Sequence, residues 1–116
     1  TKQGSVQAEK IIFACHFPFV NFPGMYFARI HQERSYVLAL KDAAQVNGMY
    51  MGAEKGDYSF RNYGEYLLLG GMGHRTGKNA GSYEALRKTA EKWFPNSREI
   101  CHWSAQDCMT LDKISI

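Results

Sequence analysis

The amino-acid sequence predicts an α+β fold, in which a mixed, largely antiparallel sheet of four or five strands is covered by one helix. Two observations carry this prediction. Between residues 35 and 71, four short apolar runs alternate with turn-forming glycine and asparagine. After them, residues 82–94 place apolar side chains at helical spacing. At 116 residues, the chain has the length of one domain.

The first apolar run is KIIFAC at residues 10–15, which predicts a strand buried on both faces because the run is too short for a helix. The next twelve residues hold Pro18, Pro23 and Gly24 among five aromatic side chains. Proline and glycine interrupt regular structure, so this stretch is expected to be irregular chain that packs against an apolar surface.

Four strands are expected next, at SYVLAL, GMYMGA, DYSFRN and EYLLLGG, beginning at Ser35. Turn-forming residues at 47–48, 55–57 and 63–64 separate them, which predicts an antiparallel meander. Within DYSFRN, the alternation of a strand places Tyr58 and Phe60 on one face and Ser59 and Arg61 on the other.

The segment GGMGHRTGKNAG at residues 70–81 is expected to be a loop because it holds five glycines. Its Gly77-Lys78 pair resembles the end of a phosphate-binding P-loop, but Met72 and Asn79 stand where that motif needs glycine and Ser or Thr. Two readings stay open. The segment is a hairpin connection with solvated charges, or a flexible loop that brings basic side chains to a substrate.

A helix is expected to begin at Ser82, an N-cap residue, with Glu84 in its first turn, and to end before Pro95. Its apolar stripe consists of Leu86, Ala90, Trp93 and Phe94. A further strand at SREICHW and a polar crossing segment, SAQDCMTLDKISI, complete the expected elements.

The cysteines Cys15, Cys101 and Cys108 leave one thiol unpaired in any disulfide scheme, which favours reduced thiols. No histidine or cysteine pair has ligand spacing on one element, so no metal site is expected. Cys15 and Cys101 each precede a histidine, but neighbours on a strand point to opposite faces, which does not suit thiolate activation.

The formal charge is +3 and the basic residues are scattered among acids, which argues against nucleic acid as the main partner. No apolar run approaches the roughly 20 residues of a membrane-spanning helix. The first ten residues lack an apolar signal core. We therefore expect no membrane partner and a cytoplasmic location.

Three further features each allow two readings. His16 directly follows the first apolar run, where it either contacts a ligand or bonds a backbone carbonyl. Arg61 is either one half of a rim salt bridge or an anchor for a carboxylate. The segment at residues 103–107 suits a pocket wall or a tight corner of the core.

Several motifs, taken in order, resemble flavin oxidoreductases of the D-amino acid oxidase and glycine oxidase type. KIIFACHFPF is similar to the strand that leaves the cofactor sheet of that family. It is followed by an arginine strand (YSFRNYG), a leucine strand ending in glycines (EYLLLGG), a polar loop (GHRTGK), a helix and a Trp segment. The likeness covers nearly the whole chain. It is greatest to a branch with HFPF, YFAR, HxTG and WSAQD patterns, whose members can carry an added Rieske iron–sulfur domain.

The resemblance implies an FAD-dependent enzyme that oxidises an amine or amino acid by hydride transfer to flavin. It implies that Ala14, Cys15 and His16 lie near the flavin. It also implies a substrate side lined by Arg61, His74, Arg75, Lys78, Trp103, Gln106 and Asp107. Asp107 stands where the amino acid oxidases have an arginine for the substrate carboxylate, so it could pair with a substrate amine instead.

The GxGxxG motif and the final glycine-rich flavin segment of that family are absent from the sequence. The chain is therefore expected to be an internal piece that does not bind FAD tightly alone. Its expected parts are a flavin-side strand and crossover at 10–34, a substrate-binding domain at 35–108 and, at 109–116, a return toward the missing FAD-binding domain. The alternative is a non-catalytic binding module whose basic glycine-rich loop holds an anionic ligand or a protein partner.

Overall fold

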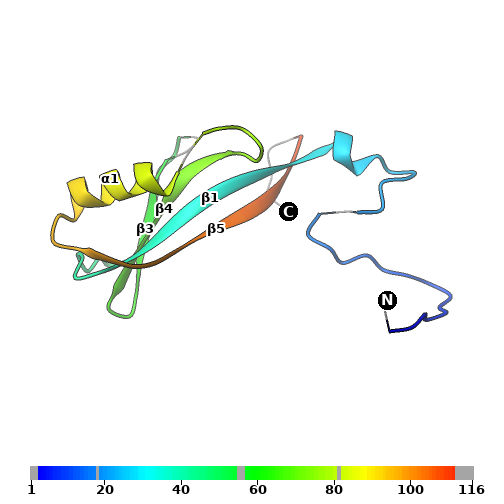
Figure 1. The fold of residues 1–116 in the computed structure, drawn as a ribbon, viewed down its shortest axis with the longest axis horizontal. Helices are drawn as coiled ribbons and strands as arrows, with labels where there is room; N and C mark the ends of the chain where they lie inside the picture. The colour runs from blue at the N-terminus through cyan, green and yellow to red at the C-terminus, as the bar shows by residue number, and fades with distance from the viewer. Residues whose placement is uncertain (1–2, 18, 55–56, 81, 112–116) are drawn as a thin grey trace.

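The structure, a computed structural model, describes residues 3–17, 19–54, 57–80 and 82–111. Its elements are η1 (Tyr26–Ala28), β1 (Ile30–Lys41), β2 (Met49–Met51), β3 (Ser59–Tyr63), β4 (Tyr66–Arg75), α1 (Tyr83–Trp93) and β5 (Arg98–Thr110). The five strands form one sheet, and α1 lies over one of its faces (Figure 1). The predicted α+β class, with one covering helix, is confirmed, and each of the four strand pairings is antiparallel.

The strand order is β2-β3-β4-β1-β5. The predicted meander is correct for β2, β3 and β4 but wrong for β1, which pairs with β4 and β5 instead of β2. The physical reason is burial: β1 contains Leu38, Ala39 and Leu40, which are all buried, and such a strand is most stable between two neighbours. β1 is therefore an interior strand, flanked on both sides.

The core lies between α1 and the sheet face beneath it. Its buried side chains are Leu38 and Leu40 of β1, Leu67 and Leu69 of β4, and Leu86 and Ala90 of α1. Tyr58 and Phe60 pack at its edge, as their predicted alternation requires. Each fully buried leucine contributes roughly 1.5–3 kcal/mol of transfer free energy.

The helix agrees with its predicted signals. The Ser82 hydroxyl accepts a hydrogen bond from the Ala85 N–H at 3.2 Å, which satisfies one of the free amides of the first turn. The helix ends at Trp93, two residues before Pro95. No helix in the described ranges is long and apolar enough to cross a membrane.

The glycine-rich segment is a strand for half its length, because β4 continues through Arg75. The prediction of a loop throughout residues 70–81 is therefore wrong, and Gly81 lies outside the described residues. The reason is close packing against β3. A Cβ at Gly70 would lie 2.8 Å from Ser59 Oγ, and a Cβ at Gly71 would lie 2.8 Å from Tyr58 Cδ1. Because these glycines have no side chain, the residues of and next to β3 can approach closely, and β4 continues through both glycines.

β5 is also longer than predicted. It continues through the residues expected to be a polar crossing segment and reaches Thr110. The twelve-residue strand β1 offers backbone partners along this whole length, with one irregularity in register between Ala39 and Leu40. Backbone pairing needs no apolar side chain, so the polar composition does not end the strand. Residues 112–116 of the expected return lie outside the described residues.

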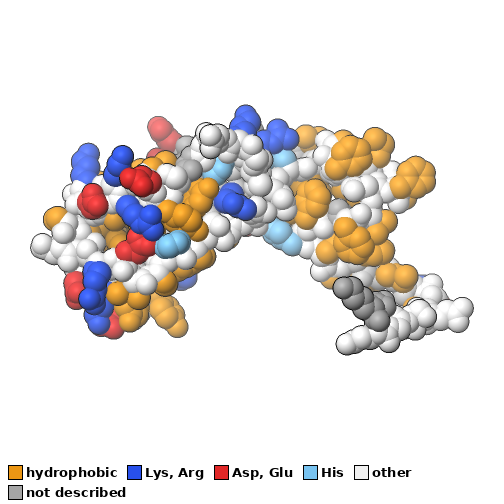
Figure 2. Space-filling model, in the orientation of Figure 1, with side chains coloured by type: hydrophobic (Ala, Val, Ile, Leu, Met, Phe, Trp, Pro, Cys, Tyr) orange, Lys and Arg blue, Asp and Glu red, His pale blue; other side chains and the backbone are white. Residues whose placement is uncertain are grey.

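The described residues between 3 and 25, here called the N-terminal arm, extend away from the sheet (Figure 1). The predicted strand at residues 10–15 is not formed, because no described strand lies beside it to complete its hydrogen bonds. Ile11, Ile12 and Phe22 are exposed there, and hydrophobic side chains gather at this end of the molecule (Figure 2). The radius of gyration is 18.5 Å, against about 13 Å for a compact chain of this length.

Candidate functional site

The sheet face opposite α1, here called the open face, is the candidate site. Strand alternation sends Leu38 and Leu69 toward α1 and their neighbours Val37, Ala39 and Leu68 to the other side. The strand register continues these positions across all five strands. One row consists of Met49, Arg61, Leu68, Ala39 and Cys101, and the next of Met51, Ser59, Gly70, Val37 and Trp103.

A pocket of about 260 Å³ lies on the open face. It brings together two of the predicted site residues, Arg61 of β3 and Trp103 of β5, although they are 42 positions apart in the chain. The rest of its lining is mainly apolar: Val37, Met49, Met51, Phe60, Leu68, Ser59 and Gly70. Sequence reasoning missed the methionines and Val37, because their shared face depends on a strand order that local patterns do not specify.

Arg61 is the one cation in the two rows of the open face. Its strand neighbours in register are Met49 and Leu68, whose side chains offer no acceptor beyond the weak one of the Met49 thioether. Within the described residues, Arg61 makes no ion pair or hydrogen bond. Of the two readings of Arg61, the rim salt bridge is therefore not formed among those residues.

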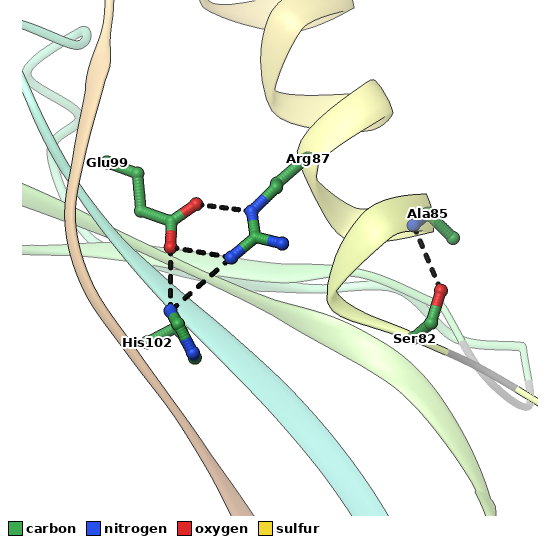
Figure 3. A network of polar contacts seen from close by, with 5 residues as sticks. All are labelled: Ser82, Ala85, Arg87, Glu99 and His102. Carbon is green, nitrogen blue, oxygen red and sulfur yellow. Dashed lines mark hydrogen bonds and ion pairs between the residues drawn. The ribbon is translucent and has the colours of Figure 1, made fainter.

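A polar network lies on the other face, between α1 and β5 (Figure 3). Arg87 donates to the two oxygens of Glu99, from Nε at 2.7 Å and from Nη2 at 3.0 Å. His102 Nδ1 lies 2.7 Å from Glu99 Oε1 and 3.4 Å from Arg87 Nη2. We assign the shorter contact as Nδ1–H donating to the carboxylate, because one imidazole nitrogen cannot also accept from Arg87.

This network shifts the ionisation of its members. The hydrogen bond from Arg87 lowers the pKa of Glu99 to about 2, and the hydrogen bond from His102 acts in the same direction. The pKa of Arg87 is raised in turn, first by its hydrogen bond to Glu99. The ion pair between Arg87 and Glu99 connects the middle of α1 to the edge strand β5. We therefore interpret it as a contact that stabilises the fold.

Two other predicted site residues, His74 of β4 and Gln106 of β5, flank Arg34 of β1 in register, and His16 contacts the backbone of Gln106. His16 Nε2 donates to the Gln106 carbonyl at 2.9 Å and ties the N-terminal arm to β5. With its amide oxygen turned toward Arg34, Gln106 accepts from Nη2 at 2.6 Å and from Nε at 3.2 Å. His74 stacks on Tyr36 with the ring centres 5.7 Å apart. This gives His16 the backbone-bonding role that its sequence position allowed.

The remaining predicted residues do not converge on the pocket. Arg75 is exposed at the end of β4, and Lys78 lies in the turn that follows. Asp107 shares a face of β5 with Trp103 but is four residues away, which is about 13 Å along a strand. In the arm, Ala14 is exposed, and Cys15 lines a separate pocket of about 480 Å³.

The histidines and cysteines are dispersed. Cys101 occupies the open face and His102 the covered face, as expected of neighbours on a strand, while Cys108 is buried. In the part of the chain that the structure describes, no three side chains among histidine, cysteine, aspartate and glutamate lie together so that they could hold a metal ion.

Comparison with known proteins gives one curated relative. The chain is 35% identical over 118 aligned positions to a protein of Bacillus subtilis (strain 168) named "Putative Rieske 2Fe-2S iron-sulfur protein YhfW". The match covers 95% of this chain and 23% of the relative, so the chain spans about a quarter of that protein's length. No family model matches the chain. No solved structure matches it either.

This finding overturns the resemblance to the D-amino acid oxidase family. The relative is named for an iron–sulfur cluster and not for a flavin, so the expected FAD cofactor, held near Ala14, Cys15 and His16, is corrected with it. The expected enzyme activity, oxidation of an amine or amino acid by hydride transfer to flavin, is corrected for the same reason. The alternative binding module built on the glycine-rich loop is not supported either. The resemblance also included a family branch whose members can carry a Rieske domain, and this one feature agrees with the relative's name.

Proposed function

We propose that this chain is part of an iron–sulfur electron-transfer protein of the Rieske type. The observation that carries the proposal is the 35% identity to the B. subtilis protein, which extends over 95% of the chain. A Rieske cluster transfers one electron at a time and has two cysteine and two histidine ligands. The described residues could hold such a cluster only if two cysteines and two histidines among them lay close together.

They do not fit a Rieske cluster. Two thiolates and two imidazoles must converge within a few ångströms, yet Cys101 and His102 occupy opposite faces of the sheet. Cys15 lies in the N-terminal arm and Cys108 is a buried residue of β5. His102 is already engaged by a carboxylate. The chain's role in the proposed protein is therefore that of a sheet module, with the cluster ligands supplied by another part.

The test is made on the full-length gene product, purified without oxygen. We expect the electron paramagnetic resonance spectrum of a Rieske cluster after reduction, together with two atoms of iron and two of acid-labile sulfide per polypeptide. A protein without iron, or with a spectrum of all-cysteine ligation, would refute the proposal.

A second measurement tests the part played by this chain. Replacing Cys15 and Cys101 with serine, and Cys108 with alanine, should leave the iron content and the spectrum unchanged. His102→Gln is the matched imidazole variant and should also keep the cluster. Loss of the cluster in any folded variant would show that this chain supplies a ligand.

A further inference from the structure

The open face has the composition of a surface that is covered in the working protein. An antiparallel sheet can leave one face in water when that face is polar. Here Met49, Met51 and Trp103 stand exposed beside Leu68 and Val37 and form a continuous apolar surface across the sheet. A sheet with an apolar face on each side needs a layer against each, and α1 covers only one of them.

Arg61 restricts what can cover this surface. It is surrounded in register by Met49, Leu68 and their row, and it has no partner among the described residues. A wholly apolar partner would remove water from the guanidinium without replacing its hydrogen bonds, which is strongly unfavourable. A partner that brings a carboxylate would instead form a bidentate pair inside an apolar rim.

We infer that the open face docks against the cluster-bearing part of the proposed iron–sulfur protein. The contact is mainly apolar, and it includes one acidic side chain of the partner, here called the acidic key, that pairs with Arg61. The identity of this partner rests on the proposed function. The B. subtilis relative leaves more than three quarters of its length outside the match, which is ample for such a part. Trp103 is the aromatic anchor of the contact and Arg61 its specificity element, and both residue types are enriched among the residues that dominate binding at the centres of interfaces.

Two tryptophans make this inference measurable. Trp103 lies on the open face and Trp93 on the helix side, and their exposed fractions are nearly equal at 42% and 43%. In the full-length protein labelled with 5-fluorotryptophan, the W93F and W103F variants identify the fluorine resonances of Trp93 and Trp103. The solvent isotope shift between H2O and D2O then reports how far each indole reaches water. We expect Trp103 to lose most of this shift and Trp93 to keep it.

Variants at Arg61 test the acidic key. R61E should restore the isotope shift of Trp103 to about that of Trp93, because two carboxylates would repel each other across the interface. R61Q should restore part of it, and R61K should keep Trp103 shielded. K92E, which reverses an exposed charge in the last turn of α1, is the matched control and should change neither resonance.

Each outcome decides the inference separately from the proposed function. Equal isotope shifts for both tryptophans in a protein that shows the Rieske spectrum would overturn the docking and leave the function standing. A shielded Trp103 in R61E would overturn the acidic key. If Trp103 becomes shielded only when hexanoate is added, the occupant is a small carboxylate and docking of a protein part is overturned. A shielded Trp103 in a protein without the cluster would overturn the named partner.

Discussion

Glu99→Gln is the sharpest test of the contact that fastens α1 to the edge strand. Glutamine keeps the size of the side chain and one carbonyl oxygen, but it removes the charge that Arg87 and His102 share. In the native network this carboxylate accepts from Arg87 Nε at 2.7 Å and Nη2 at 3.0 Å and from His102 at 2.7 Å. The variant therefore loses one strong acceptor and the charge assistance of the others.

The size of the effect follows from the lowered pKa of Glu99. A change from the ordinary 4.5 to about 2 corresponds to roughly 3.4 kcal/mol, at about 1.4 kcal/mol for each pH unit. Water screens the pair, since the Arg87 side chain is 41% exposed and the Glu99 side chain 25%. We therefore expect a loss of about 1–2 kcal/mol in the free energy of unfolding at pH 7.

The pH dependence gives this prediction its direction. Because the pKa of Glu99 is lower in the folded protein, its stabilisation is fully present above pH 4.5 and is lost as the pH falls toward 2. Glutamine does not ionise, so the gap in stability between the natural protein and the variant should narrow over that range. Urea unfolding followed by circular dichroism at pH 7, 4 and 3 measures the gap. Glu91→Gln, on the exposed side of α1, is the control. A gap that is absent at pH 7, or that stays constant to pH 3, would refute the assignment.

Three further changes test the packing by thermal or urea unfolding. Leu86→Ala empties the centre of the core and should cost about 2–5 kcal/mol, and a cost under 1 kcal/mol would contradict the packing described. Ser82→Ala removes the cap on the Ala85 N–H and should cost about 1 kcal/mol, whereas Ser82→Asp should retain most of the stability. Gly71→Ala places a methyl group 2.8 Å from Tyr58 and should cost about 1–3 kcal/mol. An unchanged melting temperature for Gly71→Ala would show that β3 and β4 lie farther apart.

Local signals in the sequence predicted the elements whose stability is local. The cap at Ser82 and the stripe of Leu86 and Ala90 specify α1 within twelve residues, and the alternation around Phe60 and Arg61 specifies the faces of β3. Each of these patterns depends on neighbours a few positions away. For this reason, the predicted helix and the predicted faces of β3 are both found in the structure.

The misses have the opposite cause. The run at residues 10–15 has every strand-forming side chain but no described neighbour, and a strand exists only where another completes its hydrogen bonds. The polar residues of β5 became strand because β1 lies beside them. In the candidate site, residue type alone points to Arg61 and to Trp103. Their shared pocket with Met49 and Met51 depends on strand order, which no local pattern specifies.

The place of β1 in the sheet has a consequence for how the chain folds. β1 precedes the other four strands of this sheet in the chain, yet its partners are β4 and β5, the second of which ends at Thr110. During synthesis, β1 cannot form its strand pairs until β4 and β5 have been made. In contrast, β2, β3 and β4 can pair with one another in order as they leave the ribosome. Closing loops of this length is slow, so we expect folding in milliseconds to seconds, as for other sheets with distant pairings. Until β5 arrives, one side of β1 presents unpaired backbone amides and carbonyls, and in this interval the nascent chain is most exposed to pairing with another molecule.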